Sequence, residues 1–290
     1  MPELPEVETI RLGLTQLLPG RTIRDAWHDW PKSFPNNSQD VQHHMVGASI
    51  VTVRRRAKVL MIDLSSRYSL VVHLKMTGQL VFRSATEHFG AGHPSHSLVG
   101  ELPDTSTRVI VTFTDGSRLF FNDQRKFGWM RLLPTTEVEQ LAFFQKVGPE
   151  PLGDDFTVAD FIARLQRRSK SGIKAALLDQ TVIAGVGNIY ADESLWGARI
   201  HPETKVAALS HNQFRELYTS LRAVLQLSIQ KGGSTDRNYV NHEGKRGSYL
   251  SFAHVFRRQG QPCTRCGTII VKTRVAGRGT HTCPHCQRIS

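Results

Sequence analysis

The sequence predicts an α+β protein of more than one domain, in which an N-terminal β-sandwich with a flanking helix precedes a helical domain and a small cysteine-bearing module. Three observations predict this order. Short β-branched runs occupy residues 49–133, helical patterns follow them, and all four cysteines lie within residues 263–286. A chain of 290 residues forms about two domains of ordinary size. The expected parts are a sandwich domain over 1–133, a linker over 134–151, a helical domain over 152–250 and a terminal module over 251–290.

Apolar residues near the N-terminal end recur at helical spacing. They are Val7, Ile10, Leu14, Leu17 and Leu18. Pro5 suits the first turn of a helix, and Pro19-Gly20 ends the pattern. We therefore predict a helix over residues 5–18 on one flank of the sandwich.

Short runs rich in β-branched residues predict the strands of an antiparallel sandwich or flattened barrel. The runs are 49–53, 59–64, 70–74, 109–114 and 118–121. Asp115-Gly116 separates the last two and is a strong hairpin signal. Residues 84–107 are rich in Ser, Gly, His and Pro without periodicity, so we expect a long surface loop there.

Capping residues mark the helical domain. Thr157 is placed to begin a helix that runs through Ser169, and Ser210 with Gln213 forms a capping box. The second helix is long and ends at Gly232-Gly233. The preceding linker is marked by Gly148-Pro149-Glu150-Pro151.

The cysteines form two pairs, Cys263-x2-Cys266 and Cys283-x2-Cys286, separated by sixteen residues. This is the spacing of two knuckles that close one tetrahedral Zn²⁺ site, and the alternative is two disulfides. Four thiolates leave no open coordination position, so the single zinc ion is expected to be structural. Residues 272–279 between the knuckles form a basic hairpin tip suited to phosphates.

The charge balance indicates a polyanionic partner. The chain has 37 Lys and Arg against 25 Asp and Glu, and residues 231–290 hold eleven of the bases against two of the acids. Nucleic acid is favoured over a membrane, because no apolar run approaches the roughly 18 residues that a span needs. No secretory signal pattern is visible, so we expect a cytoplasmic protein.

The chain begins Met1-Pro2-Glu3-Leu4-Pro5-Glu6. Removal of the methionine would expose a secondary amine, which can condense with an aldehyde-level carbon to form an iminium. Glu3 and Glu6 are near enough in sequence to move protons during such chemistry. The alternative is an ordinary helix start, in which acidic residues complement the positive end of the helix dipole.

Four features occur here in one order: the Pro-Glu-Leu-Pro-Glu start, the β domain, the segment Gly185-Val186-Gly187-Asn188-Ile189-Tyr190 in the helical domain and the four-cysteine module. Together they resemble the formamidopyrimidine-DNA glycosylase family over essentially the whole chain. The resemblance implies a helix-two-turn-helix domain, a β-hairpin zinc finger and a bifunctional enzyme of base excision repair. Such enzymes excise oxidised purines, 8-oxoguanine and formamidopyrimidines, from double-stranded DNA and then nick the strand. It also implies a monomer without an obligate protein partner, in the bacterial cytoplasm and associated with the nucleoid.

The resemblance also implies catalytic roles for five residues. Pro2 would attack the sugar C1′ to form a Schiff base, Glu3 would donate a proton as the sugar ring opens, and Glu6 would support the local network. Lys58, which follows three arginines, matches the lysine assigned to β-elimination and to a phosphate contact. Arg278 matches the arginine that grips phosphate and is assigned to δ-elimination.

The implied DNA contacts fall into three groups. Asn188, Lys170 and Lys174 match positions that bind the backbone, although isolated lysines are usually solvated. Met76, Arg125 and Phe127 match residues that fill the space left by the everted nucleotide, whereas the residues alone would place Met76 and Phe127 in the core. Arg237 lies in the region 232–237, which resembles the loop that closes over the everted base.

Two departures accompany the resemblance. Ser106-Thr107-Arg108 stands where family members often have a His-x-His pair, and Arg237 stands where some have lysine. Two alternatives are an endonuclease VIII-like glycosylase for oxidised pyrimidines, against which Leu4 and the complete Met76, Arg125 and Phe127 set argue, and a non-catalytic binder of distorted DNA.

Overall fold

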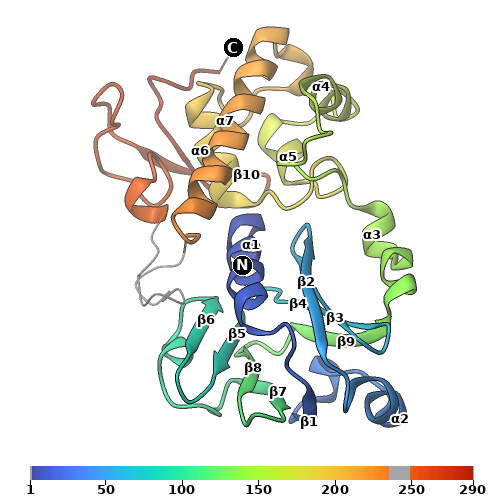
Figure 1. The fold of residues 1–290 in the computed structure, drawn as a ribbon. Helices are drawn as coiled ribbons and strands as arrows, with labels where there is room; N and C mark the ends of the chain where they lie inside the picture. Colours follow the sequence, from blue (N-terminus) through green and yellow to red (C-terminus); the bar gives the residue numbers. More distant parts are fainter. Residues whose placement is uncertain (1, 235–248, 290) are drawn as a thin grey trace. The chain divides into compact units, whose positions relative to one another are not determined.

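The computed structural model describes residues 2–234 and 249–289 (Figure 1). Its internal contacts divide the chain into two units. The first comprises residues up to Gln145 together with the described residues from Lys231 to Ser234, and the second comprises Lys146–Gln230 and the described residues from Tyr249 onward. The division falls inside the predicted linker, which contains a 3-10 helix (Thr135–Gln140) and the short helix α3 (Ala142–Lys146).

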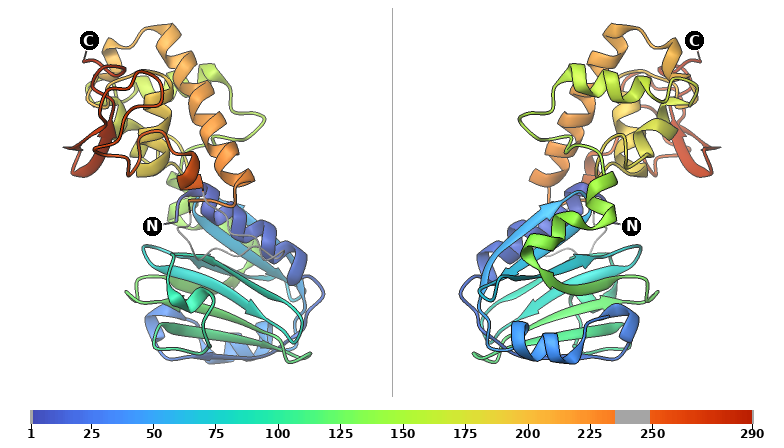
Figure 2. Two further views of the ribbon diagram at one scale, coloured as in Figure 1. Left: turned by 90° about the vertical axis from the view of Figure 1, so that its left-hand side faces the viewer. Right: turned by 90° about the vertical axis from the view of Figure 1, so that its right-hand side faces the viewer.

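The first unit holds two antiparallel sheets (Figures 1 and 2). The five-stranded sheet has the order β1 (Ile23–His28), β7 (Thr107–Phe113), β8 (Arg118–Asp123), β5 (Gly78–Arg83) and β6 (His88–Gly92). The four-stranded sheet has the order β2 (Ile50–Arg56), β3 (Val59–Leu64), β4 (Tyr68–His73) and β9 (Trp129–Pro134). Both sheets contribute side chains to one hydrophobic core, as the buried Leu60 and Ile62 on β3 and Val111 on β7 illustrate. The predicted sandwich is confirmed.

Helix α1 (Leu4–Leu17) closes one side of this sandwich. It contacts β2 and β6, which are the edge strands of the two sheets. At this contact Gly13 leaves space for the ring of Phe89, since a Cβ on Gly13 would lie 2.2 Å from that ring. The predicted helix over residues 5–18 is confirmed, and it covers two sheet edges that would otherwise offer unpaired backbone groups.

Four strands of the sandwich were not predicted, namely β1, β5, β6 and β9. The clearest correction concerns residues 84–107, which the sequence assigned to one long loop. Residues 88–92 of that stretch form β6, which pairs with β5, and His96–Leu98 form a 3-10 turn. Gly90 and Gly92 conceal β6 from sequence analysis, because glycine disfavours strands and breaks hydrophobic alternation.

The second unit is helical and carries one β-hairpin (Figure 1). Its helices are α4 (Val158–Gln166), α5 (Ile173–Leu178), α6 (Asn188–Gly197) and α7 (His211–Gln230). The hairpin consists of β10 (Val271–Val275) and β11 (Arg278–Thr282). The predicted cap at Thr157 and the predicted capping box at Ser210 both form: Thr157 Oγ1 accepts a hydrogen bond from Asp160 N, and Ser210 Oγ accepts one from Gln213 N.

Short 3-10 or π segments complete the described secondary structure. They are Pro31–Ser33, Val41–Met45, Val206–Ala208 and Tyr249–Phe252, with one turn of α-helix, α2, at Ser38–Asp40. Within the described ranges, no helix combines the length and apolar character that crossing a bilayer would require.

Candidate nucleic-acid interface and zinc site

The N-terminal segment is held by the carboxylate of Glu6. Pro2, Glu3 and Glu6 are all buried, and Glu6 Oε2 accepts a hydrogen bond of 2.8 Å from the backbone N–H of Glu3. Glu6 Oε1 accepts another of 2.8 Å from Ser234 N. Gly233 has a φ of +85°, and a Cβ there would lie 3.3 Å from Glu6. Glu6 therefore ties the segment that carries Pro2 to the start of the 232–237 region.

Arg55 connects helix α1, which carries Glu8, to the β2–β3 turn, which carries Lys58. Its Nε donates to Glu8 Oε2 at 2.7 Å, and its Nη1 donates to the carbonyl of Ala57 at 2.9 Å. Burial acts to raise the pKa of Glu8, but hydrogen bonds from Arg11 and Arg55 outweigh it and hold that pKa below its usual range. Lys58 is only 7% exposed, so it is largely enclosed by protein although it follows three arginines in the sequence. Ala57 has a φ of 54° and forms the β2–β3 turn with Lys58.

His73 lies beside this turn, because it pairs with Val59 across β4 and β3. Burial, together with the positive charges of Lys75 and Lys58, lowers the pKa of His73 to about 4. Its Nδ1 accepts a hydrogen bond of 2.9 Å from Lys75 N, which requires that nitrogen to be unprotonated. The ring is therefore neutral near pH 7 and carries its proton on Nε2.

The three predicted void-filling residues come from two loops of the first unit. Met76 follows β4 and is half-buried, whereas Arg125 and Phe127 follow β8 and are exposed. Phe127 is 56% exposed and Arg125 lies over its ring, with the guanidinium carbon 5.0 Å from the centroid. The alternative that Phe127 belongs to the core is wrong. An aromatic ring held in solvent is suited to insertion between bases.

The carboxylate of Asp123 holds both loops through hydrogen bonds. It is fully buried, and its Oδ2 accepts hydrogen bonds from Phe127 N at 2.8 Å and Gly128 N at 2.7 Å. Its Oδ1 accepts from Arg125 N at 3.2 Å and from the hydroxyl of Thr77, the residue after Met76. One carboxylate thus fixes the backbone that carries the three residues.

Arg108 supports this arrangement from the interior. It is 4% exposed, and its Nε donates to the carbonyl of Asp123 at 3.0 Å. Its remaining nitrogens donate to Asp29 and to the carbonyl of Thr105. Arg108 therefore does not offer DNA a surface contact in place of the second histidine of the His-x-His pair.

In the second unit, Asn188 is the first residue of α6 and follows the turn made by Gly185, whose φ is 78°. Its Nδ2 donates a hydrogen bond of 2.9 Å to the carbonyl of Gly279 on β11. Arg278 lies next to Gly279 at the start of β11 and is exposed at the tip of the hairpin. The structure therefore brings the two predicted phosphate-binding residues to neighbouring positions.

The two predicted backbone-contacting lysines differ. Lys170 is exposed and can reach a phosphate. Lys174 is 0% exposed, and its Nζ lies 2.6 Å from Asp192 Oδ1. Both the prediction that Lys174 contacts DNA directly and the alternative that it is solvated need correction, since its ammonium is enclosed by protein. Arg237 lies outside the described residues.

An open hollow of about 580 Å³ lies on the second unit beside Asn188. It is lined by Asn188, Phe256, Arg257, Gln259, Lys272, Gly279 and His281. Its lining contains arginine and lysine but no carboxylate, which suits the backbone of a nucleic acid.

The four cysteines fit a tetrahedral metal. Their sulfur atoms all lie within 4.8 Å of one another. The sulfurs of Cys266 and Cys283 are 3.5 Å apart, and those of Cys263 and Cys286 are 4.0 Å apart. Zn–S bonds of about 2.3 Å place tetrahedral sulfurs about 3.8 Å apart, whereas a disulfide needs about 2.05 Å. The residues therefore fit one zinc ion, which would hold the finger and perform no chemistry.

Replacement of Cys263 by alanine tests this site. The finger is expected to lose its zinc and unfold, because the metal supplies its folding free energy, and duplex binding is expected to weaken about tenfold. Zinc content per chain and the dissociation constant should be measured together. Thr264→Ala, at the exposed neighbouring position, is the control. One zinc per chain and full DNA affinity in the Cys263 variant would show that the assignment is wrong.

Comparison with known proteins assigns the family. Three family models match in order: the formamidopyrimidine-DNA glycosylase N-terminal domain over residues 1–130, the H2TH domain over 147–239, and the zinc finger found in FPG and IleRS over 260–289. The formamidopyrimidine-DNA glycosylase of Enterococcus faecalis is 41% identical over 290 residues, covering 100% of this chain and 98% of the relative. That of Geobacillus kaustophilus is 42% identical over 290 residues, covering 99% and 100%.

The chain belongs to the formamidopyrimidine-DNA glycosylase family.

Solved structures of the family agree with this fold. The complex of Lactococcus lactis Fpg with DNA that contains an abasic site superposes with a TM-score of 0.86 at 33% identity, covering 99% of both chains. MutM in complex with DNA that contains carbocyclic 8-oxo-G superposes with a TM-score of 0.85 at 33% identity, covering 99% of this chain and 100% of that one. The predicted α+β fold, with a helix-two-turn-helix domain and a zinc finger, is confirmed.

In this member of the glycosylase family, four residues that hold the predicted site residues in place were not predicted from the sequence. They are Arg55, His73, Asp123 and Asp192. The first three surround Lys58 and the void-filling loops, and Asp192 lies beneath Asn188. None of them forms a short motif of its own. The only available signal was position, because Asp123 ends a strand and Asp192 lies one helical turn after Asn188.

Proposed function

We propose that this protein is a bifunctional DNA glycosylase and AP lyase of base excision repair, which removes 8-oxoguanine and formamidopyrimidines from double-stranded DNA. The observation that carries the proposal is the match of the whole chain to enzymes named formamidopyrimidine-DNA glycosylase. The solved relatives are complexes with DNA that contains Fapy-dG, 8-oxo-G analogues or abasic sites.

The proposed chemistry begins at Pro2. Once Met1 is removed, the Pro2 nitrogen attacks C1′ of the damaged nucleotide, and the N-glycosidic bond breaks with its electron pair leaving on the base. Opening of the sugar ring breaks the C1′–O4′ bond, with a proton from Glu3 delivered to O4′, and leaves an iminium between Pro2 and C1′. The hydrogen bond from Glu3 N to Glu6 supports this assignment, because it holds Glu3 at the start of α1.

Strand cleavage follows from the acidity that the iminium gives to the neighbouring C–H bonds. Loss of a C2′ proton breaks the C3′–O bond, and loss of a C4′ proton then breaks the C5′–O bond, so both phosphates leave and water hydrolyses the Schiff base. We assign phosphate binding to Lys58, Lys170, Asn188 and Arg278, and support of the everted state to Met76, Arg125 and Phe127. The exposed positions of Phe127 and Arg278 support these roles.

We also infer that the enzyme acts as a monomer in the bacterial cytoplasm, on nucleoid DNA. The excess of 37 bases over 25 acids supports a DNA-associated location.

Borohydride trapping tests the proposed function. The protein is incubated with a duplex that contains one 8-oxoguanine opposite cytosine, reduced with borohydride and analysed by peptide mass spectrometry. We expect a covalent adduct on Pro2, with an undamaged duplex as the control. Failure to trap an adduct from protein confirmed to begin at Pro2 would contradict the proposal, and the same assay with an oxidised pyrimidine would then test the endonuclease VIII-like alternative.

A further inference from the structure

The hairpin that carries Arg278 requires support from outside itself. Among the described residues, β10 and β11 pair only with each other, and a two-stranded ribbon is at best marginally stable alone. Four of the five residues of β10 are exposed, whereas three of the five residues of β11 are buried. The direction in which Arg278 points is therefore set by whatever holds β11.

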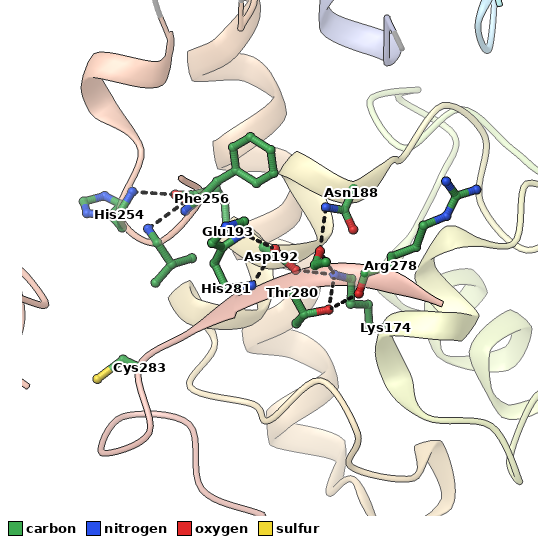
Figure 3. A network of polar contacts seen from close by, with 12 residues as sticks. Lys174, Asn188, Asp192, Glu193, His254, Phe256, Arg278, Thr280, His281 and Cys283 are labelled. Carbon is green, nitrogen blue, oxygen red and sulfur yellow. Dashed lines mark hydrogen bonds and ion pairs between the residues drawn. The ribbon is translucent and has the colours of Figure 1, made fainter. Parts of the chain in front are cut away.

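The carboxylate of Asp192 on α6 is the central contact to β11 (Figure 3). Asp192 Oδ2 accepts a hydrogen bond of 2.9 Å from His281 N and lies 3.2 Å from His281 Nδ1. Its Oδ1 lies 2.6 Å from Lys174 Nζ. Asp192 and Lys174 are each 0% exposed and His281 is 4% exposed, so little solvent screens these contacts.

Lys174 extends the contact toward Arg278. Its Nζ donates to Thr280 Oγ1 at 2.7 Å and to the carbonyl of Gly279 at 3.3 Å. Thr280 Oγ1 in turn donates to the carbonyl of Arg278 at 3.0 Å. The backbone from Arg278 to His281 is thus held by a continuous set of polar contacts that begins at Asp192.

Asn188 belongs to the same arrangement. It lies four residues before Asp192, so the two side chains share one face of α6. Asn188 Nδ2 donates to the carbonyl of Gly279, to which Lys174 also donates. The two residues to which we assign phosphate binding, one on a helix and one on the hairpin, are therefore fixed relative to each other through Gly279.

We propose that Asp192, with Lys174 as its counter-ion, is a positioning residue that holds Arg278 and Asn188 in the spacing required to grip one stretch of DNA backbone. This inference rests on the proposed function, because it assumes that both residues contact phosphate. Asp192 itself touches neither DNA nor the reacting atoms.

The test is Asp192→Asn, which keeps the size of the side chain and removes its charge. We expect binding to a duplex with a tetrahydrofuran abasic-site analogue to weaken about tenfold. The plot of log association constant against log salt concentration has a negative slope, and we expect it to become shallower by about 0.9, which corresponds to the loss of one phosphate contact. Zinc content and circular dichroism should remain those of the parent protein. Ser228→Ala is the matched control, since it removes another buried hydrogen bond of α6, that of Tyr190 to Ser228, without touching β11.

A double-mutant cycle with Arg278→Ala decides how Asp192 acts. If it acts through Arg278, Asp192→Asn has almost no further effect on affinity in the Arg278→Ala background. Additive effects would overturn the proposal. Asp192→Asn alone leaves the positive charge of Lys174 buried without its counter-ion. The double variant Lys174→Met with Asp192→Asn removes both charges and so restores the balance. Recovery of thermal stability without recovery of affinity supports positioning, and recovery of both would show that only charge balance matters.

Two outcomes separate this inference from the proposed function. If Arg278→Ala leaves affinity and salt slope unchanged, the phosphate role of Arg278 fails. If Arg278→Ala weakens binding and Asp192→Asn does not, only the positioning role fails. Should Asp192→Asn lose its zinc or its fold, Thr280→Val provides the second variant, because it removes the hydroxyl between Lys174 and Arg278 within β11. It is expected to weaken binding about threefold, and unchanged affinity would contradict the proposal.

Discussion

Pro2→Gly is expected to reduce excision of 8-oxoguanine by on the order of 10²-fold or more. Glycine still provides an N-terminal amine once the methionine is removed, but the amine is primary and no ring restricts its backbone. Pro2 is buried beside Glu3 and Glu6, so the parent nitrogen is held at the start of α1 rather than on a free tail. Loss of this restraint should misplace the nucleophile.

Single-turnover excision and the yield of the borohydride adduct measure the effect. Mass spectrometry must first establish that both proteins begin at residue 2. Pro5→Ala is the matched control, because it alters a proline in the first turn of the same helix without altering the terminal nitrogen. Unchanged excision by Pro2→Gly, or an adduct located on a lysine in the parent protein, would show that Pro2 is not the nucleophile.

The elements predicted well from the sequence are those whose side chains repeat with the period of the element. The 3.6-residue pattern placed α1 within one residue of its observed bounds, and the β-branched run at 59–64 coincides with β3. The capping residues Thr157 and Ser210 placed the starts of α4 and α7 correctly. β6 could not be predicted in this way, because its glycines leave too few apolar side chains to show alternation.

The residues to which we assign the chemistry were predicted from motifs and the family resemblance that these carry, but the residues that hold them in place were not. The contacts around Asp123 and Asp192 depend on backbone N–H groups and on strands that are distant in sequence, as the hydrogen bond from His281 N to Asp192 illustrates. Lys174 shows the same limit. Its residue type suggested a surface contact, whereas its burial is decided by Asp192 and Thr280, which no local pattern connects to it.

Asp123→Ala is expected to destabilise the first unit by about 3 kcal/mol and to lower excision of 8-oxoguanine by on the order of 10²-fold. The substitution leaves the N–H groups of Phe127 and Gly128 without their acceptor and releases the hydroxyl of Thr77. Arg125, Phe127 and Met76 would then no longer be held in one geometry. Chemical denaturation and single-turnover excision measure the two effects.

The substrate dependence of this variant separates a role in base eversion from a general loss of fold. Extrusion of a paired base costs a few kcal/mol, whereas a preformed abasic site has no base to extrude. Because we assign support of the extruded state to the void-filling residues, Asp123→Ala should impair 8-oxoguanine excision much more than cleavage at an abasic site. Asp63→Ala is the control, because Asp63 is a largely buried carboxylate of the same unit that bonds Arg54 and Ser69, away from both loops. Equal losses on the two substrates would mean that Asp123 only stabilises the fold.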